Sequence, residues 1–286
     1  MKNIAIVCDS SISFTNEEIE KYDVFVVPNI IMHNEKEYLD LVTINNQELY
    51  SLLKQNETVT TSQPNLGDVI ETFEKIKEGN YDHVIVLTIS SALSGGFNAF
   101  NQGAKQSGIK NCTVIDTKTV GGPVQQAIKA IRKLNEEGKS LEEIFDFLDY
   151  LFAHQSSYII PETLHQIVAS GRLSKTAGKL ATLLKVKVAL LIDSKGETID
   201  RLAVARTDKK LFDSIVNHIV QNGVKPEGYD LYFLESDAMK QVEAFKDYVL
   251  DKIGKFKYEI KELPAGLSVH AGVGTIVLQW CPKISV

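Results

Sequence analysis

The sequence predicts an α/β fold with two domains: an N-terminal α/β domain on a parallel sheet, residues 1–154, and a C-terminal α+β domain on a mixed sheet, residues 155–286. In the first domain, short apolar runs rich in β-branched residues alternate with amphipathic helical stretches, which is typical of a parallel sheet with right-handed crossovers. In the second, two apolar runs are joined directly by Ser194-Lys195-Gly196, a hairpin signal. We therefore expect antiparallel pairs in the C-terminal sheet.

Local signals place the elements of the N-terminal domain in order. Apolar runs predict strands at 3–8, 24–32, 36–41, 83–89 and 112–115. Capping residues before amphipathic stretches predict helices at 16–22, 46–55 and 141–152. Three further helices have one predicted bound each: one begins near 66, one begins at 97, and one ends at 137. Residues 33–35 resemble a hairpin turn, and residues 58–64 form a hydroxyl-rich extended segment.

The C-terminal domain begins with a new apolar run near Tyr158. Strands are predicted at 158–160, 186–192, 198–205, 229–235, 256–263 and 275–280. Helices are predicted at 164–169, 175–184, 209–221 and 239–253. Residues 268–274 contain Gly272 and Gly274, so we expect a glycine-rich loop around His270.

The composition is that of a globular protein, with 44% hydrophobic and 24% charged residues. A net charge of −6 argues against binding to nucleic acid or to an anionic membrane surface. Cys8, Cys112 and Cys281 lie far apart, which predicts neither a zinc site nor a disulfide framework. The chain shows no signal-peptide pattern and no apolar run that could span a bilayer, so we expect a cytoplasmic protein without stable membrane insertion.

The stretch 83–104 combines a buried strand, a hydroxyl-rich loop ending in Gly95-Gly96, and a helix. Backbone N–H groups and serine hydroxyls at a helix N-terminus favour an anion, and ligands of open α/β sheets bind beyond the carboxyl ends of strands. A phosphate-binding P-loop is excluded because no lysine follows Gly96, and the dinucleotide fingerprint is absent. A small anion such as a carboxylate remains. The alternative is that the serines only cap the helix and the glycines relieve a tight turn.

Three further residues are candidates for a site. Five of the six histidines show no metal-ligand spacing, whereas His270 has glycine neighbours that let backbone approach a ligand. Arg206 follows an apolar strand and is either a structural ion-pair partner or an anchor for an anion. Arg172 is another possible anchor, with a structural role slightly favoured. No metal or cofactor site is predicted.

Six short motifs follow one another from one end of the chain to the other. They are Asp9-Ser10-Ser11, Thr61-Ser62-Gln63-Pro64, Ile89-Ser90-Ser91-Ala92-Leu93-Ser94-Gly95, Gly171-Arg172-Leu173-Ser174, Arg206-Thr207 and His270-Ala271-Gly272-Val273-Gly274. In type and order they resemble the motifs of the DegV family. The second and third motifs are specific as a pair, whereas either alone would be weak.

The resemblance implies a bacterial lipid-binding protein whose two α/β domains hold one long-chain fatty acid between them. It also implies a functional relationship to the fatty-acid-binding subunits of bacterial fatty acid kinase. By matching motifs, Thr61 and Ser94 would hold the carboxylate, with His270 close by. Ser62 and Gly95 belong to the same two motifs and are counted with this site.

The resemblance also implies a partner. The chain would be a carrier, not an enzyme, that presents the carboxylate to a separate kinase subunit. That subunit would use ATP to form an acyl phosphate for phospholipid synthesis, and Arg206 would lie near the mouth where it docks. The chain departs from the usual family pattern in two places, at Asp116-Thr117 with Val120-Gly121-Gly122 and at Ser170-Gly171-Arg172. These departures bear on acyl-chain preference and on docking.

Two other functions are open from the residues. One is a serine-dependent hydrolase in which Ser94 is the nucleophile and His270 its base. Ser94 does not lie in a Gly-x-Ser-x-Gly elbow, and no acid is clearly paired with His270. The other is a module that binds a phosphorylated metabolite, which the scarcity of basic residues near the loops disfavours.

Overall fold

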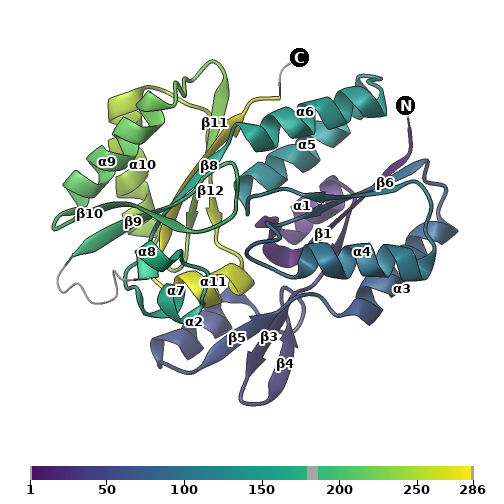
Figure 1. Ribbon diagram of the computed structural model, residues 1–286, viewed down its shortest axis with the longest axis horizontal. Coiled ribbons are helices and arrows are strands. Elements are labelled where there is room, and N and C mark those ends of the chain that lie inside the picture. Colours follow the sequence, from purple (N-terminus) through teal and green to yellow (C-terminus); the bar gives the residue numbers. More distant parts are fainter. Residues whose placement is uncertain (1, 179–185, 285–286) are drawn as a thin grey trace.

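The computed structural model describes residues 2–178 and 186–284, which form three β-sheets with helices packed on their faces (Figure 1). The first sheet has the order β2-β1-β6-β7, and every pair in it is parallel. Its strands are β1 (Ile4–Asp9), β2 (Val24–Val27), β6 (His83–Thr88) and β7 (Cys112–Asp116). All six residues of β1 are buried, as its continuous apolar run predicts. The parallel N-terminal sheet is confirmed.

The predicted strand at 24–32 is wrong because two strands in different sheets occupy it. β2 ends at Val27, and β3 (Ile30–His33) pairs with β4 (Lys36–Leu39) and β5 (Val59–Ser62) in a separate antiparallel sheet. Pro28 between them has no N–H for a ladder hydrogen bond. The Asn29 side chain instead donates to the Asp9 carboxylate at 3.2 Å, which redirects the chain.

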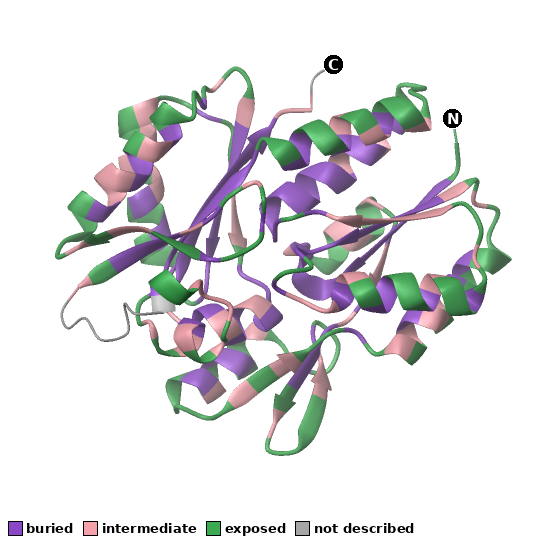
Figure 2. Ribbon diagram, in the orientation of Figure 1, coloured by how far each residue is buried: buried purple, intermediate pink, exposed green. Residues whose placement is uncertain are grey.

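Helices cover both faces of the parallel sheet. On one face lie α3 (Leu66–Glu78) and α4 (Gly96–Ser107), which share a core with the outward side chains of β1 and β6. On the other face lie α5 (Gly122–Glu136) and α6 (Leu141–Ala153), which also contact β13 (Ile276–Pro282) of the third sheet. α5 is buried along most of its length because it packs against both sheets (Figure 2). The short helices η1 (Ser10–Ile12), α1 (Asn16–Lys21) and α2 (Asn46–Lys54) complete this half.

The third sheet is mixed and has the order β10-β9-β8-β13-β11-β12, in which only the β11–β12 pair is parallel. Its strands are β8 (Ser156–Ile160), β9 (Lys187–Ile192), β10 (Asp200–Ala205), β11 (Tyr229–Glu235), β12 (Tyr258–Glu262) and β13 (Ile276–Pro282). Its outer face is covered by α9 (Asp208–Gln221) and α10 (Met239–Ile253), and its inner face turns toward α5 and α6. The mixed C-terminal sheet is also confirmed, while the boundary at 154/155, between α6 and β8, stays a prediction.

The expected glycine-rich loop around His270 is wrong, because His270 lies on a helix. α11 (Ala265–Ala271) follows Pro264 and ends where Gly272 adopts a φ of 88°. Pro264 suits a helix start, and the positive φ of Gly272 suits a helix stop. The glycines thus end a helix that holds His270 in a fixed direction. Two other short helices, α7 (His165–Ala169) and α8 (Lys175–Gly178), lie nearby, and the rest of the predicted helix 175–184 is outside the described residues.

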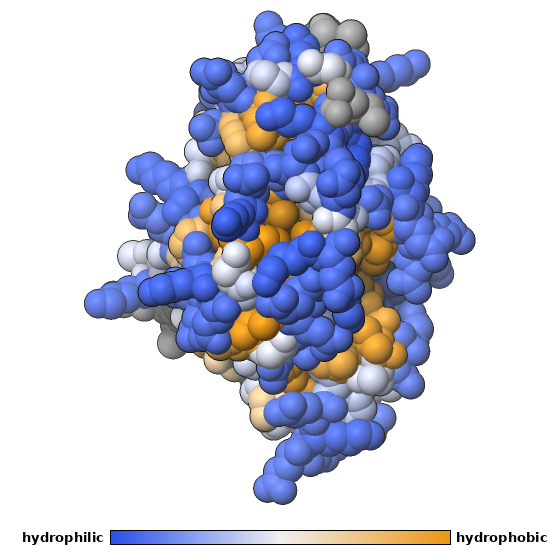
Figure 3. Space-filling model, turned by 90° about the vertical axis from the view of Figure 1, so that its right-hand side faces the viewer, coloured by the Kyte–Doolittle hydropathy of each residue, from blue (hydrophilic) through white to orange (hydrophobic). Residues whose placement is uncertain are grey.

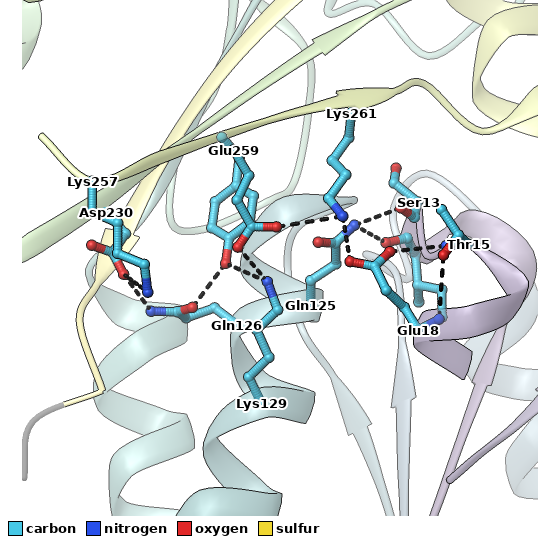
Figure 4. Close-up of polar contacts among 12 residues, drawn as sticks. Ser13, Thr15, Glu18, Gln125, Gln126, Lys129, Asp230, Lys257, Glu259 and Lys261 are labelled. Atoms are coloured by element: carbon cyan, nitrogen blue, oxygen red, sulfur yellow. Dashed lines mark hydrogen bonds and ion pairs between the residues drawn. The ribbon is translucent and has the colours of Figure 1, made fainter. Parts of the chain in front are cut away.

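Polar contacts join the parallel-sheet half to the mixed sheet away from the loops (Figure 4). Lys129 of α5 pairs with Glu259 of β12 at 2.6 Å, and Lys261 of β12 pairs with Glu18 of α1. At the loops themselves, Ser90 of the loop after β6 donates to the carbonyl of Gly196 in the turn between β9 and β10. The two halves are therefore held together on both sides of the space between them.

The surface on the side shown in Figure 3 is largely hydrophilic, and its apolar side chains lie in separate patches. Among the helices that the structure describes, none has both the length and the apolar character needed to cross a bilayer.

Candidate functional site

A cavity lies between the loops at the carboxyl end of the parallel sheet and the inner face of the mixed sheet. It encloses about 970 Å³ of empty space, including its open mouth. Its walls are mainly aliphatic side chains from both halves, among them Ile89, Leu93, Ile159, Ile192, Leu234 and Val277. Ligand pockets are mostly apolar with a few converging polar groups, so the lining of this cavity suits a largely apolar ligand with a polar end.

The polar residues of the cavity come from distant parts of the chain. Thr61 and Ser62 are on β5, Ser94 and Gly95 precede α4, and His270 is on α11. All five predicted pocket residues line this one cavity. Their assignment to a fatty-acid carboxylate stays a prediction.

Gly95 lies close to the side chain of Gln63. A Cβ on Gly95 would lie 1.7 Å from the side-chain oxygen of Gln63, so a larger residue would force that flexible side chain to shift. At the same place the Ser94 hydroxyl accepts a hydrogen bond from the Gly96 N–H at 3.2 Å. Its own hydrogen has no acceptor among residues 2–178 and 186–284, and it remains available to a ligand.

A hydrogen-bond chain fixes which nitrogen of His270 carries the proton. Arg172 Nη1 lies 3.1 Å from His270 Nδ1, and a guanidinium can only donate, so Nδ1 must accept. In the neutral ring the proton is then on Nε2, which lies 2.6 Å from Thr61 Oγ1 and donates to it. The Thr61 hydroxyl hydrogen is left free to donate to a third group. The chain Arg172–His270–Thr61 therefore points a donor into the cavity.

The electrostatics agree with a neutral His270. Burial and, to a smaller extent, the positive charge of Arg172 together lower the pKa of His270 to about 4. A ring with that pKa is uncharged near neutral pH. It can donate through Nε2 but is a weak base.

Arg172 is the functional candidate that the sequence reasoning undervalued. It lines the cavity, and its Nε donates to the Leu93 carbonyl at 2.8 Å while Nη1 donates to the Ser170 carbonyl at 3.1 Å. No carboxylate pairs with Arg172 in the described part of the chain. Its positive charge therefore lies near the hydroxyls of Thr61 and Ser94 without a countercharge. The signal in the sequence is its place in the motif Gly171-Arg172-Leu173-Ser174, which does not by itself show that the guanidinium reaches His270.

A buried polar cluster supports the same wall of the cavity. Ser10 donates to the Asp40 carboxylate at 2.8 Å, and Asn29 donates to the Ser11 hydroxyl at 3.0 Å. Burial raises the pKa of Asp40 to about 6. The Gly266 N–H at the start of α11 lies 3.4 Å from the same Asp40 oxygen. The cluster therefore links the loop after β1 to the helix that carries His270.

The hydrolase alternative is not favoured by this geometry. A serine triad needs a carboxylate that accepts from Nδ1–H of the histidine, whereas Nδ1 of His270 accepts from a guanidinium. Nε2 is bonded to Thr61 rather than to Ser94. No group of three or more possible metal-ligating side chains occurs in the described ranges either.

Arg206 does not line the cavity. It is exposed directly after β10 and borders a separate surface groove with Thr207 and Lys210 of the α9 end. The structure thus places Arg206 apart from Thr61, Ser94 and His270.

Comparison with known proteins decides the family. The model of the DegV family of uncharacterised proteins matches residues 3–283. The chain belongs to the DegV family. A DegV domain-containing protein of Staphylococcus aureus strain MRSA252 is 29% identical over 275 residues, which cover 96% of each chain.

Solved structures share the fold. One, described as fatty acid binding of a DegV family protein from Thermus thermophilus, has a TM-score of 0.89 and 26% identity and covers 98% of this chain and 99% of that one. Another, described as a fatty-acid (stearic acid)-binding protein from Eubacterium ventriosum, has a TM-score of 0.89, 23% identity and the same coverage.

The low pKa of His270 predicts a pH dependence of stability. In the unfolded chain the ring takes up a proton as the pH falls through its ordinary value of 6.5, whereas the folded ring stays neutral down to about 4. The unfolded state then binds more protons, so stability falls as the pH falls, by about 2 kcal/mol between about pH 7.5 and about pH 5.

The measurement is urea unfolding of the wild type and of His270→Gln at both pH values. The variant lacks the titration of His270 but keeps Asp40 and the other titratable groups. On acidification its free energy of unfolding should therefore fall by about 2 kcal/mol less than that of the wild type. Equal losses in the two proteins would show that the folded His270 titrates normally.

Proposed function

We propose that this DegV protein binds one long-chain fatty acid, with its carboxylate at Thr61, Ser94 and His270 and its acyl chain in the aliphatic cavity. The observation that carries the proposal is a cavity with mainly apolar walls in which Thr61, Ser94 and His270 lie together with Arg172. The descriptions of the Thermus and Eubacterium structures as fatty-acid-binding proteins support it.

The chemistry of the donors suits a carboxylate. A carboxylate taken out of water must have its hydrogen bonds replaced. The free hydrogens of Thr61 and Ser94 are two donors, and the backbone N–H groups at the start of α4 add a favourable dipole. Arg172 supplies a positive charge close to His270. The acid is thus held as its anion without a direct ion pair.

The acyl chain supplies most of the affinity. Burying a methylene gains roughly 0.8 kcal/mol, so ~14 methylenes approach ~11 kcal/mol before the costs of association. The hydroxyls of Thr61 and Ser94, together called the hydroxyl cluster, then contribute mainly to the orientation of the acid. The cluster keeps the carboxylate at the solvent-facing end, where a second protein can reach it.

We further propose that the chain is the carrier subunit of a fatty acid kinase system. A separate kinase subunit would dock over the groove that contains Arg206 and phosphorylate the carboxylate with ATP, giving an acyl phosphate for phospholipid synthesis. Arg206 is exposed and makes no ion pair with the described residues, which suits a residue that meets a partner. Because ATP is the phosphate donor, this work would take place in the cytoplasm.

Removal of both hydroxyls tests the carboxylate site. Thr61→Ala with Ser94→Ala should weaken fatty-acid binding strongly, because each lost hydrogen bond to a charged group costs roughly 1.5–3 kcal/mol. A fluorescent fatty-acid titration measures the loss, and thermal unfolding checks the fold. Thr60→Ala is the matched control, because Thr60 is the exposed neighbour of Thr61 on β5 and points to the opposite face. Unchanged affinity of the double variant would refute the site.

Arg206 and His270 should fail in different ways. Arg206→Ala should keep fatty-acid binding near normal but lower acyl phosphate formation when the kinase subunit and ATP are added. His270→Ala should impair both, since a loosely held carboxylate is misplaced for in-line transfer.

The assay combines purified kinase subunit with a direct binding titration of each variant. Arg201→Ala is the control, because Arg201 is also exposed on β10 but does not border the groove. Loss of fatty acid from Arg206→Ala as severe as from His270→Ala would place Arg206 in the pocket. Normal phosphorylation by both variants would remove the main support for a carrier.

A further inference from the structure

The lining of the cavity has partly exposed and fully buried polar residues. Thr61, Ser94 and His270 are each partly exposed. Ser157 and Gln279, which pair across the adjacent strands β8 and β13, also line the cavity but have 0% of their surface exposed. A tail that extends from the hydroxyls into the buried part of the cavity can therefore meet Gln279.

Gln279 is an unusual residue in the lining of a mainly apolar cavity. It lies on β13, where the neighbours that point to the same face, Val277 and Cys281, belong to the apolar core. A buried primary amide is costly unless its hydrogen bonds are met. Gln279 meets them: its Nε2 donates to the Val120 carbonyl at 2.8 Å and to Ser157 Oγ at 2.7 Å.

The third bond of Gln279 reaches the start of α5. Its side-chain oxygen accepts from the Gly122 N–H at 2.8 Å. The glycine pair makes room for this contact, because a Cβ on Gly121 would lie 3.0 Å from the same oxygen, and one on Gly122 would lie 2.4 Å from Cγ of Tyr232. Gln279 thus joins β13 to the loop before α5 through groups that are mostly backbone. It cannot swing aside without leaving those groups unpaired in a buried place.

We propose that Gln279 is the closed end of the cavity and sets the greatest length of acyl chain that the protein accepts. The inference rests on the proposed function and adds a specificity-determining residue to it. Each methylene buried raises affinity about fourfold. Affinity should therefore rise with chain length until the terminal methyl meets the Gln279 amide, and should stop rising there.

The experiment measures dissociation constants for saturated acids from dodecanoic to docosanoic acid with the wild type, Gln279→Ala and Gln279→Leu. The wild type should show a break in the series. Gln279→Ala opens space for about two methylenes and should move the break to acids about two carbons longer. Gln279→Leu keeps nearly the same volume without the hydrogen bonds, so its break should stay where the wild type has it.

The outcomes separate this inference from the proposed function. A continuous rise in wild-type affinity up to docosanoic acid, or a break that stays in place in Gln279→Ala, overturns the role of Gln279 while fatty-acid binding stands. Failure of every acid to bind the wild type overturns the proposed function itself, and the inference with it. If Gln279→Ala does not fold, as judged by thermal unfolding, Gln279→Val replaces it, and an unmoved break in that variant has the same meaning.

Discussion

The hydrogen bond between His270 and Thr61 joins positions 209 residues apart in the chain, and the site depends on it. It requires the small antiparallel sheet that carries β5 and the helix α11 that precedes β13 to meet at the mouth of one cavity. Arg172 gives the bond its direction by occupying the other nitrogen of the ring. As a result, the neutral His270 donates to the Thr61 hydroxyl and leaves the hydrogen of that hydroxyl free to donate. An anion at the hydroxyl would then have no direct contact with a full positive charge.

The polar residues of the cavity, its apolar wall and the separate groove at Arg206 are placed by how the halves meet. The loops at the carboxyl end of the parallel sheet supply Ser94 and Gly95, while the inner face of the mixed sheet supplies most of the wall. Polar bonds on both sides of the cavity, such as Lys129–Glu259 and Ser90–Gly196, hold these surfaces together. A carrier needs this arrangement, since the tail must be dry while the reacting group stays within reach of another protein. The weak basicity of His270 fits binding better than hydrolysis.

Much of this could be predicted from the sequence, because each local signal agreed with the final fold. The continuous apolar run of β1 and the capping boxes of α1, α2 and α6 are decided by nearby residues, and all of them form. The failures have non-local causes. Hydrophobicity alone does not show that Pro28 and Asn29 divide a strand between two sheets. The glycines after His270 resemble a loop because nothing in the sequence shows that α11 packs beside α2 and α7. Gln279 and Arg172 each make contacts with residues far away in the chain, such as Gly122 and His270, which local patterns do not show.

The central claim is that the cavity holds one fatty acid non-covalently with its carboxylate at the hydroxyl cluster. Native mass spectrometry of the protein purified from bacteria tests it most directly. The account predicts a complex that is heavier than the chain by the mass of one long-chain fatty acid, and a return to the mass of the bare chain on denaturation. A mass increase that survives denaturation as an ester on a serine would contradict it. So would a bare chain that takes up no fatty acid when one is supplied.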